Sequence, residues 1–402
     1  MNIRIEPSRA HGAVAAPPSK SYAHRLLLCA ALAQGHSTVR NVAQSEDMLA
    51  TLDCIAALGA QYRADGSSIT VLGRAGTQAD NACFPCRESG STLRFFIPAA
   101  LLAGRRARFT GTARLMERGV GIYEALFAER GVLLQREPEA LTVQGVLTPG
   151  RYTLRGNVSS QFVSGLLMAL PLLSGESVVE VLPPVESRAY IDITLDCMRR
   201  FGVTAEETER NTFRVPGRQA YRPADVTVEG DWSNAAALYA FNALDGSVSV
   251  TGLNDDSLQG DRACLALLNR LSEPGAEIDL SGCPDLGPVL FTAAAANHGA
   301  VFTGTARLRI KESDRAQVMA GELAKFGVNA RVLENAVIIP AGPLHAPDAV
   351  LDGHGDHRIV MALSLAASRT GGVIAGCEAV RKSFPDYFDV LRRLGVHAAT
   401  IH

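Results

Sequence analysis

Only four of the 39 basic residues are lysines, and three of those four lie in segments that are otherwise polar or charged. The four are Lys20, Lys311, Lys325 and Lys382. Arginine fills the other basic positions, as a compositional bias would do on a tolerant surface. Lysine is the compact cation whose ammonium group readily gives up a proton when it is buried. Chance explains Lys325, which lies on the face of an expected helix, and we expect the other three to take part in chemistry.

Two further segments concentrate charge. Five of the seven residues at 309–315 are charged, and the segment follows an apolar stretch, although a surface loop can have the same composition. Asp356, His357 and Arg358 open an otherwise apolar helix, and burying such charges without partners costs free energy. Arg381 lies directly before one of the rare lysines. These segments predict a site for charged ligands.

Small and hydroxylated residues stand at the starts of other expected helices. A plain helix cap explains one serine of Ser159–Ser160, but not both serines together with Gln161. Ser21 and Arg25 are four residues apart and share a helical face. Gly90 lies in a turn of small residues, where the backbone can approach a ligand closely. Such helix starts suit anions because they present unpaired N–H groups and a partial positive charge.

Two spacings could suggest metal or redox chemistry, and we expect neither. Cys83 and Cys86 form a close pair, but no second pair follows at zinc-finger spacing. His354 and His357 lack a third and fourth ligand nearby in the sequence. We therefore predict no metal and no cofactor.

The helix starts belong to a pattern that occurs six times. Each repeat opens with a polar or glycine-bearing entry, continues as a helix that is apolar nearly all round, and ends near a glycine. The six stretches are residues 20–35, 89–104, 159–175, 231–246, 284–299 and 355–372. Their starts give a period of about seventy residues, with one shorter step between the fourth and the fifth. Helices that are apolar on every side should be buried.

A β-prone run, a second helix with one polar face and two short strands follow most of these helices. The fourth repeat lacks much of its last strand pair. Six such α/β units divide into two lobes of three, a first lobe over 17–228 and a second made of 1–16 and 229–402. The N-terminal segment should add a strand to the second lobe, with hinges near 16–18 and 227–230. If the buried helices point their N-termini at the gap between the lobes, that gap attracts anions.

The bulk composition argues against several classes of partner. A formal net charge of −2 speaks against a general nucleic-acid binder. No apolar run reaches about 18 residues, so no segment should span a membrane. The N-terminus lacks the apolar core of a signal peptide, and we expect a cytoplasmic protein. A hinged, closing enzyme needs free lobes, which favours a monomer.

Taken together, these segments resemble the 5-enolpyruvylshikimate-3-phosphate synthases over essentially the whole chain. The matching motifs are PSKSYAHR, ESGSTLR, RLMERGVG, NVSSQFVSGLLM, ESRAYIDIT, CPDLGP, RIKESDR, GDHR and RKSFPDYF. The resemblance implies a two-lobed inside-out α/β barrel with three βαβαββ units per lobe, parallel buried helices and ligands in the cleft. It also implies transfer of the enolpyruvyl group of phosphoenolpyruvate to the 5-hydroxyl of shikimate 3-phosphate, on the pathway to chorismate and aromatic amino acids.

The resemblance further implies which side chains contact the two small-molecule substrates. Those expected to bind shikimate 3-phosphate are Lys20, Ser21, Arg25, Ser159, Ser160, Gln161, Ser187, Asp285 and Lys311. Those expected to bind phosphoenolpyruvate are Lys20, Gly90, Arg118, Gln161, Arg315, Arg358 and Lys382. Arg315 and Arg358 would clamp the enolpyruvyl carboxylate, a bidentate task that suits guanidinium groups.

The reaction of the family is an addition followed by an elimination. The 5-hydroxyl attacks C2 of phosphoenolpyruvate while a proton goes to C3, and the tetrahedral intermediate then loses that proton and phosphate. Asp285 is the expected base for the hydroxyl. Glu312 and Lys20 are alternative groups for the proton at C3, and the sequence does not decide between them.

The chain departs from the commonest bacterial pattern of the family at two positions. Glu88 stands where an asparagine is frequent, and Arg307 stands where an asparagine often contacts the shikimate phosphate. We therefore assign no role to Arg307. Gly90 is the position at which the family is sensitive to glyphosate, a phosphoenolpyruvate mimic. We expect glyphosate to compete with phosphoenolpyruvate and Gly90→Ala to weaken it.

Two other functions fit parts of the pattern. The sister enzymes that transfer enolpyruvyl to UDP-N-acetylglucosamine typically carry a cysteine in a mobile loop of the first lobe, but no cysteine lies between Cys86 and Cys197 here. A non-catalytic anion-binding protein would be favoured by loss of Asp285, Glu312 or Lys20, and all three are present. Phosphate release from phosphoenolpyruvate that requires shikimate 3-phosphate would separate these possibilities.

Overall fold

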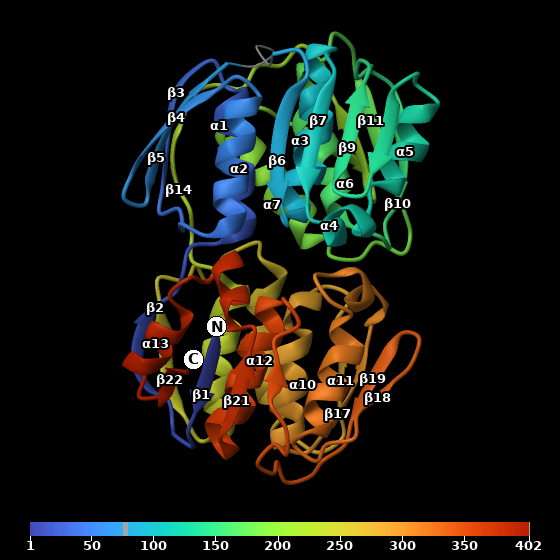
Figure 1. Cartoon of the computed structure of the whole chain (residues 1–402). Coiled ribbons are helices and arrows are strands. Elements are labelled where there is room, and N and C mark those ends of the chain that lie inside the picture. Colours follow the sequence, from blue (N-terminus) through green and yellow to red (C-terminus); the bar gives the residue numbers. More distant parts are fainter. Residues whose placement is uncertain (75–78, 402) are drawn as a thin grey trace. The chain divides into compact units, whose positions relative to one another are not determined.

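The computed structural model describes residues 1–74 and 79–401, and the chain forms two compact units (Figure 1). Pro18–Glu229 form one unit, called the N-terminal unit below. Met1–Pro17 and Gly230–His402 form the other, called the C-terminal unit. The N-terminal segment therefore belongs to the same unit as the second half of the chain.

Within residues 18–74 and 79–229, three four-stranded sheets follow one pattern. The first contains, in spatial order, β14 (Asp225–Thr227), β3 (Gly35–Arg40), β5 (Ser68–Gly73) and β4 (Gln61–Asp65). The second contains β6 (Ala82–Arg87), β7 (Ala107–Gly111), β9 (Ala140–Gln144) and β8 (Leu133–Glu137). The third contains β10 (Arg151–Arg155), β11 (Ser177–Leu182), β13 (Thr212–Val215) and β12 (Glu206–Glu209). In each sheet the first pair is parallel and the other pairs are antiparallel, so the repeats of the sequence recur in the strand pairing.

The apolar helices of the N-terminal unit are buried, as their composition predicts. They are α1 (Lys20–Leu32), α3 (Gly90–Ala100) and α6 (Ser160–Ala169), the last two followed by the 3-10 turns η1 (Leu101–Ala103) and η2 (Leu170–Leu172). The helices that follow in each repeat are α2 (Glu46–Ala57), α4 (Ala113–Arg118), α5 (Gly121–Ala128) and α7 (Ala189–Arg200), and each keeps exposed positions. α3 packs against α6, α1 against α7, and α2 against β6. The bodies of the buried helices therefore pack against their neighbours, whereas Lys20, Ser91 and Gln161 in their first turns are partly exposed.

The described part of the C-terminal unit has two four-stranded sheets and one two-stranded sheet. One four-stranded sheet contains, in spatial order, β20 (Leu351–Asp352), β21 (Gly372–Ala375), β1 (Asn2–Ile5) and β22 (Ala398–Ile401). The other contains β16 (Ala276–Asp279), β17 (Ala300–Thr303), β19 (Ala336–Ile339) and β18 (Arg331–Val332). The short sheet pairs β15 (Ser247–Thr251) with β2 (His11–Ala15). β1 also pairs with β21 and β22, so the predicted N-terminal strand is confirmed. The two-stranded sheet belongs to the fourth repeat, the one that is short in the sequence.

The helices of the C-terminal unit repeat the same division. The buried ones are α8 (Trp232–Tyr239), α10 (Gly287–Ala296) and α12 (His357–Thr370). The outer ones are α9 (Cys264–Arg270), α11 (Arg315–Ala324) and α13 (Tyr387–Arg393), and the 3-10 turns are η3 (Ala240–Leu244), η4 (Gly260–Ala263), η5 (Pro284–Leu286), η6 (Ala306–Ile310) and η7 (Cys377–Lys382). All six predicted α/β repeats are present, and the predicted fold class is confirmed.

The two helices expected at 231–246 and 284–299 are shorter than their apolar stretches. The first changes from α8 to η3 at Ala240, and the second begins as η5 before α10 starts at Gly287. Pro288 explains the second boundary, because it has no N–H to donate to the oxygen of Pro284 and is tolerated only in the first turn of a helix.

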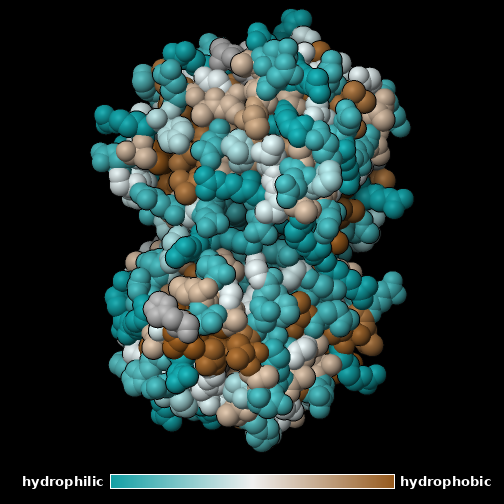
Figure 2. All heavy atoms as spheres, viewed as in Figure 1, coloured by the Kyte–Doolittle hydropathy of each residue, from teal (hydrophilic) through white to brown (hydrophobic). Residues whose placement is uncertain are grey.

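The surface is mainly hydrophilic, with scattered apolar areas on the face that Figure 2 shows. Among the large apolar side chains, Leu133, Val350 and Val146 are the most exposed, at 57%, 56% and 53%. Leu133 pairs with Gln144, two residues before Val146, whereas Val350 belongs to the C-terminal unit. In the residues that the structure describes, no helix is both long and apolar enough to cross a bilayer.

Candidate functional site

Arg25 lies in α1 and is 2% exposed. Its Nε donates to Thr194 Oγ1 at 2.7 Å and its Nη2 to Ser164 Oγ at 3.1 Å, so α1, α6 and α7 meet at this guanidinium. Its other bonds go to the main-chain oxygens of Ser21 and Tyr190. All these partners are neutral, and burial lowers the pKa of Arg25 to about 10, which leaves it charged at neutral pH. A buried cation with neutral partners favours an anionic ligand.

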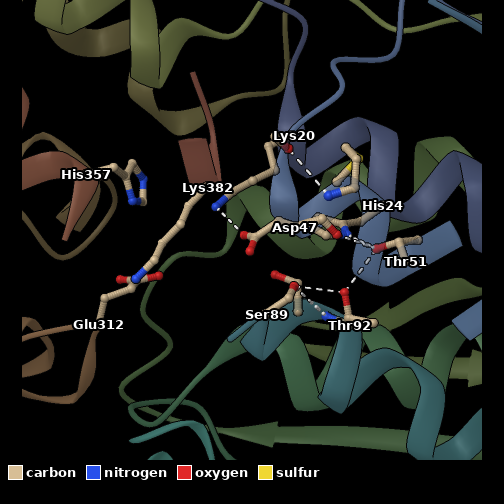
Figure 3. Close-up of polar contacts among 12 residues, drawn as sticks. Lys20, His24, Asp47, Thr51, Ser89, Thr92, Glu312, His357 and Lys382 are labelled. Atoms are coloured by element: carbon tan, nitrogen blue, oxygen red, sulfur yellow. Dashed lines mark hydrogen bonds and ion pairs between the residues drawn. The ribbon is translucent and has the colours of Figure 1, made fainter. Parts of the chain in front are cut away.

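Lys20 is the first residue of α1, and its Nζ pairs with Asp47 Oδ2 of α2 at 2.8 Å (Figure 3). The two side chains are 19% and 13% exposed, so neither member of the pair is fully buried. Ser21 is partly buried beside it. Asp47 was not identified from the sequence, where it is one of several polar residues in an amphipathic helix.

A chain of hydrogen bonds runs from α1 to α2 and α3 (Figure 3). His24 Nδ1 lies 2.6 Å from Thr51 Oγ1, and Thr51 Oγ1 lies 2.9 Å from Thr92 Oγ1. Thr92 in turn donates to Ser89 Oγ at 2.8 Å. Burial, aided by the charge of Lys20, holds the pKa of His24 well below its ordinary value, so the ring is neutral. The chain fixes three helices to one another at the ends that carry polar residues.

Replacement of Thr51 by valine tests this chain, because valine keeps the shape of threonine and removes the hydroxyl. We expect the free energy of unfolding to fall by about 1–3 kcal/mol, since buried polar atoms of His24 and Thr92 lose their shared partner. Chemical denaturation measures the loss. Thr227→Val is the matched control, because the Thr227 side chain is exposed. Equal denaturation midpoints for the two variants would contradict a structural role for the chain.

Two guanidinium groups lie against Gly90 at the start of α3. A Cβ atom on Gly90 would lie 3.0 Å from Arg118 Nη2 and 3.1 Å from Arg94 Nη1. Arg94 Nη1 donates to Gln161 Oε1 at 2.5 Å, and Gln161 Nε2 donates to Ser91 Oγ at 2.9 Å. The structure thus brings three of the predicted site residues together. It adds Arg94, which the sequence signalled only by its position four residues after Gly90.

Three predicted phosphate-binding serines occupy two helix starts. Ser159 accepts from Gln161 N at 3.3 Å and so acts as an N-cap of α6. Ser160 is 5% exposed and Ser187 is 1% exposed. Ser187 also has a φ of 55°, a left-handed conformation that a residue other than glycine adopts only at a cost in free energy. Capping therefore explains one of these serines and leaves the other two for another role.

In the C-terminal unit, Arg315 is the centre of the charged site and is 1% exposed. Its Nε contacts Asp356 Oδ2 at 2.8 Å, its Nη1 contacts Asp285 Oδ1 at 2.7 Å and its Nη2 contacts Glu312 Oε2 at 2.8 Å. Burial opposes its charge, but the three carboxylates together hold the pKa of Arg315 well above its ordinary value. Arg315 Nη2 also donates to Asp356 Oδ1. Four of the five N–H groups of the Arg315 guanidinium therefore donate to carboxylate oxygens. The predicted clamp residue is thus already held by protein carboxylates.

Asp285 and Lys311 form an ion pair next to this arginine. Lys311 Nζ lies 2.9 Å from Asp285 Oδ1. Burial acts to raise the pKa of Asp285, but Lys311, Arg315 and Arg358 outweigh it and hold that pKa well below its ordinary value. Burial also lowers the pKa of Lys311, and Asp285 opposes this only in part. The pair therefore combines an ionised carboxylate that can accept from a hydroxyl with a lysine that loses its proton more readily than in water.

Two more predicted cations lie at the start of α12. Arg358 is 6% exposed, and its Nη1 donates to Ser233 O at 2.8 Å and to Asn234 Oδ1 at 3.1 Å. Lys382, the last residue of η7, is 8% exposed and donates to Gly355 O. The positive end of the α12 dipole adds to their attraction for an anion.

The structure adds to two sequence-based interpretations. Arg307 is 6% exposed and depresses the pKa of Lys311, so it lies near the charged cluster although no role was assigned to it. Asp356, which the sequence placed at the start of an apolar helix, is the N-cap of α12 and accepts from Arg358 N. Within residues 1–74 and 79–401, no group of three or more His, Cys, Asp and Glu side chains is arranged to hold a metal ion.

A family model described as EPSP synthase (3-phosphoshikimate 1-carboxyvinyltransferase) matches residues 5–391. The chain is 38% identical to the 3-phosphoshikimate 1-carboxyvinyltransferase of Clostridium kluyveri, over 98% of this chain and 97% of that protein. It is 35% identical to the protein of the same name from Clostridium novyi, with the same coverage.

Solved structures show the same fold. An EPSP synthase from Acinetobacter baumannii superposes with a TM-score of 0.80 at 24% identity, covering 99% of this chain and all of that chain. The enolpyruvyl transferase NikO from Streptomyces tendae also gives a TM-score of 0.80, at 18% identity and with 99% and 98% of the two chains covered.

Proposed function

This chain belongs to the EPSP synthase (3-phosphoshikimate 1-carboxyvinyltransferase) family, and from that membership we propose how its residues divide the work of the reaction. It is a transferase of the shikimate pathway that moves the enolpyruvyl group of phosphoenolpyruvate to the 5-hydroxyl of shikimate 3-phosphate. The side chains that bind and activate the two substrates are the subject of the proposal.

We propose that the N-terminal unit supplies most contacts to shikimate 3-phosphate. Arg25 is suited to an anionic group of the substrate because it is buried and its partners are neutral. Ser160 and Ser187 are buried hydroxyls at helix starts, and with Ser159 they would donate to the phosphate oxygens. Lys20 and Ser21 would contact the same substrate from the first turn of α1. In the C-terminal unit, the proposed contacts to the shikimate hydroxyls are Asp285 and Lys311.

The proposed contacts to phosphoenolpyruvate are mainly cations. Arg118 and Gln161 lie around Gly90, where the small residue leaves room for the ligand beside the guanidinium groups. Arg315 and Arg358 would bind the enolpyruvyl carboxylate, and Lys382 the departing phosphate. Lys20 would touch both substrates. Since Arg315 has only one N–H left for a ligand, we propose that substrate binding shifts one of its carboxylate contacts.

In the addition step, Asp285 is proposed to accept the proton of the 5-hydroxyl while that oxygen bonds to C2. The low pKa of Asp285 makes it a weak base as long as Lys311 and Arg315 both stabilise its charge. A substrate carboxylate that engages Arg315 would take up part of this positive charge and raise the proton affinity of Asp285. The base would therefore become strongest when phosphoenolpyruvate is in place.

A second proton must reach C3 in the addition and leave it again in the elimination. Glu312, 17% exposed, and Lys20, 19% exposed, are the two proposed groups for this transfer. When the proton leaves C3, its electron pair forms the new double bond, and the bond between C2 and the phosphate oxygen breaks. Arg118 and Lys382 would stabilise the charge on the departing phosphate.

The observation that supports this proposal most directly is the partly buried contact of Asp285 with both Lys311 and Arg315, at 2.9 and 2.7 Å. Purified protein given both substrates and no added metal should release phosphate, and either substrate alone should give none. Phosphate release from phosphoenolpyruvate alone would contradict the proposal. So would release that depends on UDP-N-acetylglucosamine instead of shikimate 3-phosphate.

Glyphosate should compete with phosphoenolpyruvate, and Gly90→Ala should raise its inhibition constant about tenfold to hundredfold. The added methyl group would press on Arg118 and Arg94, and such overpacking costs about 1–3 kcal/mol. Steady-state inhibition at several phosphoenolpyruvate concentrations measures the change. Gly321→Ala is the matched control, since no atom lies within 4 Å of a Cβ atom there. Equal inhibition constants for both variants would refute the proposed place of Gly90.

We further propose a cytoplasmic monomer whose lobes, 17–228 and 1–16 with 229–402, bend near 16–18 and 227–230. The two segments that connect the units are hydrogen-bonded to each other within each unit. In the N-terminal unit Ser19 N donates to Glu229 O, and in the C-terminal unit Asp231 N donates to Pro17 O, both at 2.8 Å. Light scattering should give the mass of one chain, 42.6 kDa. X-ray scattering should report a smaller radius of gyration when both ligands are added. An unchanged radius would argue against bending.

A further inference from the structure

Asp261 is a buried acid that none of the proposed substrate contacts uses. It lies in η4, which packs against α8, in the short fourth repeat. Asp261 is only 4% exposed. In the described residues, neither Asp261 nor Arg358 forms an ion pair within 4.0 Å.

Unsatisfied polar atoms gather around Asp261 and Arg358. In the part of the chain that the structure describes, Asn234 Nδ2 and Arg358 Nε are buried and have no hydrogen-bond partner. The buried Asp261 carboxylate interacts with the Ser233 hydroxyl, which acts to lower the pKa of Asp261. Arg358 nevertheless contacts Ser233 and Asn234 through its Nη1, so these atoms belong to one neighbourhood. Unsatisfied groups at the base of a cation that is proposed to bind substrate indicate a site adjusted to binding rather than to stability.

Several charged groups act on Asp261 from the elements around it. Burial is the main influence and raises the pKa of Asp261 to about 7. Asp285 of η5 and Asp231, the N-cap of α8, add repulsion, whereas Arg358 of α12 attracts its negative charge. The thiols of Cys264 and Cys283 also interact with it, and burial raises the pKa of both thiols, so they stay neutral. Arg358 is thus the cation that responds most directly to the ionisation of Asp261.

We propose that Asp261 is a positioning residue for phosphoenolpyruvate, which acts through Arg358. Ionised Asp261 offsets part of the positive field of Arg358, and protonated Asp261 leaves that field to the substrate carboxylate. The inference depends on the proposed binding of that carboxylate by Arg358. A bound carboxylate makes the surroundings of Asp261 more negative, so Asp261 takes up a proton when phosphoenolpyruvate binds. By linkage, affinity for phosphoenolpyruvate then falls as the pH rises through about 7.

The first test compares the pH dependence of KM for phosphoenolpyruvate in the wild type and in Asp261→Asn, at saturating shikimate 3-phosphate. Asparagine has the same shape and is neutral at every pH. Between about pH 6 and pH 9, the ratio of wild-type KM to variant KM should rise about threefold to tenfold, while kcat stays within about twofold. Titration of the substrate phosphate cancels in this ratio. Asp256→Asn, which removes an exposed carboxylate of the same unit, should follow the wild type. A ratio that is constant with pH overturns the inference.

The second test counts protons directly and needs no catalysis. Phosphoenolpyruvate is titrated calorimetrically into each protein without shikimate 3-phosphate, at about pH 7, in two buffers of different ionisation enthalpy. The wild type should take up a larger fraction of a proton than Asp261→Asn, and equal uptake overturns the inference. If Asp261→Asn does not fold, Asp261→Ser, which also has no side chain that titrates in this range, takes its place in the same comparison. If the wild type releases phosphate with both substrates but takes up no more protons than the variant, only this inference is overturned. If the protein releases no phosphate, the proposed function is overturned as well.

Discussion

Asp285→Asn should lower kcat for phosphate release by about 10³- to 10⁴-fold. Asparagine can still accept a hydrogen bond from the 5-hydroxyl, but it cannot take the proton when the oxygen attacks C2. Its effect on binding should be smaller, because Lys311 and Arg315 remain. Arg315 also keeps its contacts with Glu312 and Asp356, so the charged cluster should stay assembled. The expected signature is a large loss in kcat with a KM for each substrate that changes by less than about tenfold.

Asp279→Asn is the matched control for this experiment. Asp279 lies six positions earlier in the same unit, is exposed, and contacts Ser281 rather than the cluster. Its replacement should leave kcat unchanged within about twofold. Melting temperatures of both variants close to that of the wild type would exclude unfolding as the cause of a lower kcat. If Asp285→Asn retained more than about a tenth of the wild-type kcat, Asp285 would not be the base, and the function of the Lys311 contact would need another explanation.

The low pKa of Asp285 also makes a prediction for the pH dependence of kcat/KM. Its carboxylate is stabilised by three cations, so the free enzyme should keep it ionised at pH values where an ordinary aspartate takes up a proton, about pH 4. An acid limb in kcat/KM at higher pH must then come from another group. Removing Asp285 should leave that limb in place in the residual activity.

The sequence predicted the fold from two features that do not depend on tertiary contacts. Helices that are apolar all round have no face to present to water, and six of them at a nearly constant period indicate six equivalent units. The polar helix starts then follow, because buried helix ends need partners. Lys20, Arg25 and Arg358 could be singled out in this way as residues whose charge interrupts an apolar helix.

The partners of those residues could not be predicted, because they lie far away in the chain. Asp47, which pairs with Lys20, is 27 residues further on, and Gln161, which accepts from Arg94, is 67 residues further on. No helical or strand periodicity links positions at such separations. Asp261 was missed for a related reason, since its short turn is polar in sequence and only the packing against α8 buries it.

Arg25→Met should raise KM for shikimate 3-phosphate by at least about thirtyfold without lowering the stability of the protein. Loss of a buried charged contact to a substrate anion costs about 2–5 kcal/mol. The same charge is unfavourable for folding, because its partners in the free protein are all neutral. Methionine fills a similar volume with an adaptable apolar chain. Ser164 and Thr194 would keep a partner, since their hydroxyls also lie 2.7 Å from each other.

Replacement of a binding residue should thus lower affinity for the substrate without lowering the stability of the protein, whereas replacement of a structural residue should lower both. Chemical denaturation of Arg25→Met should give a free energy of unfolding equal to or above that of the wild type, whereas steady-state kinetics should show the loss in affinity. Arg200→Met is the matched control, because Arg200 lies on α7, is 35% exposed and pairs with Asp196. It should leave KM for shikimate 3-phosphate unchanged. A less stable Arg25→Met protein with a normal KM would show that α1, α6 and α7 need the guanidinium for packing, and that the substrate anion binds elsewhere.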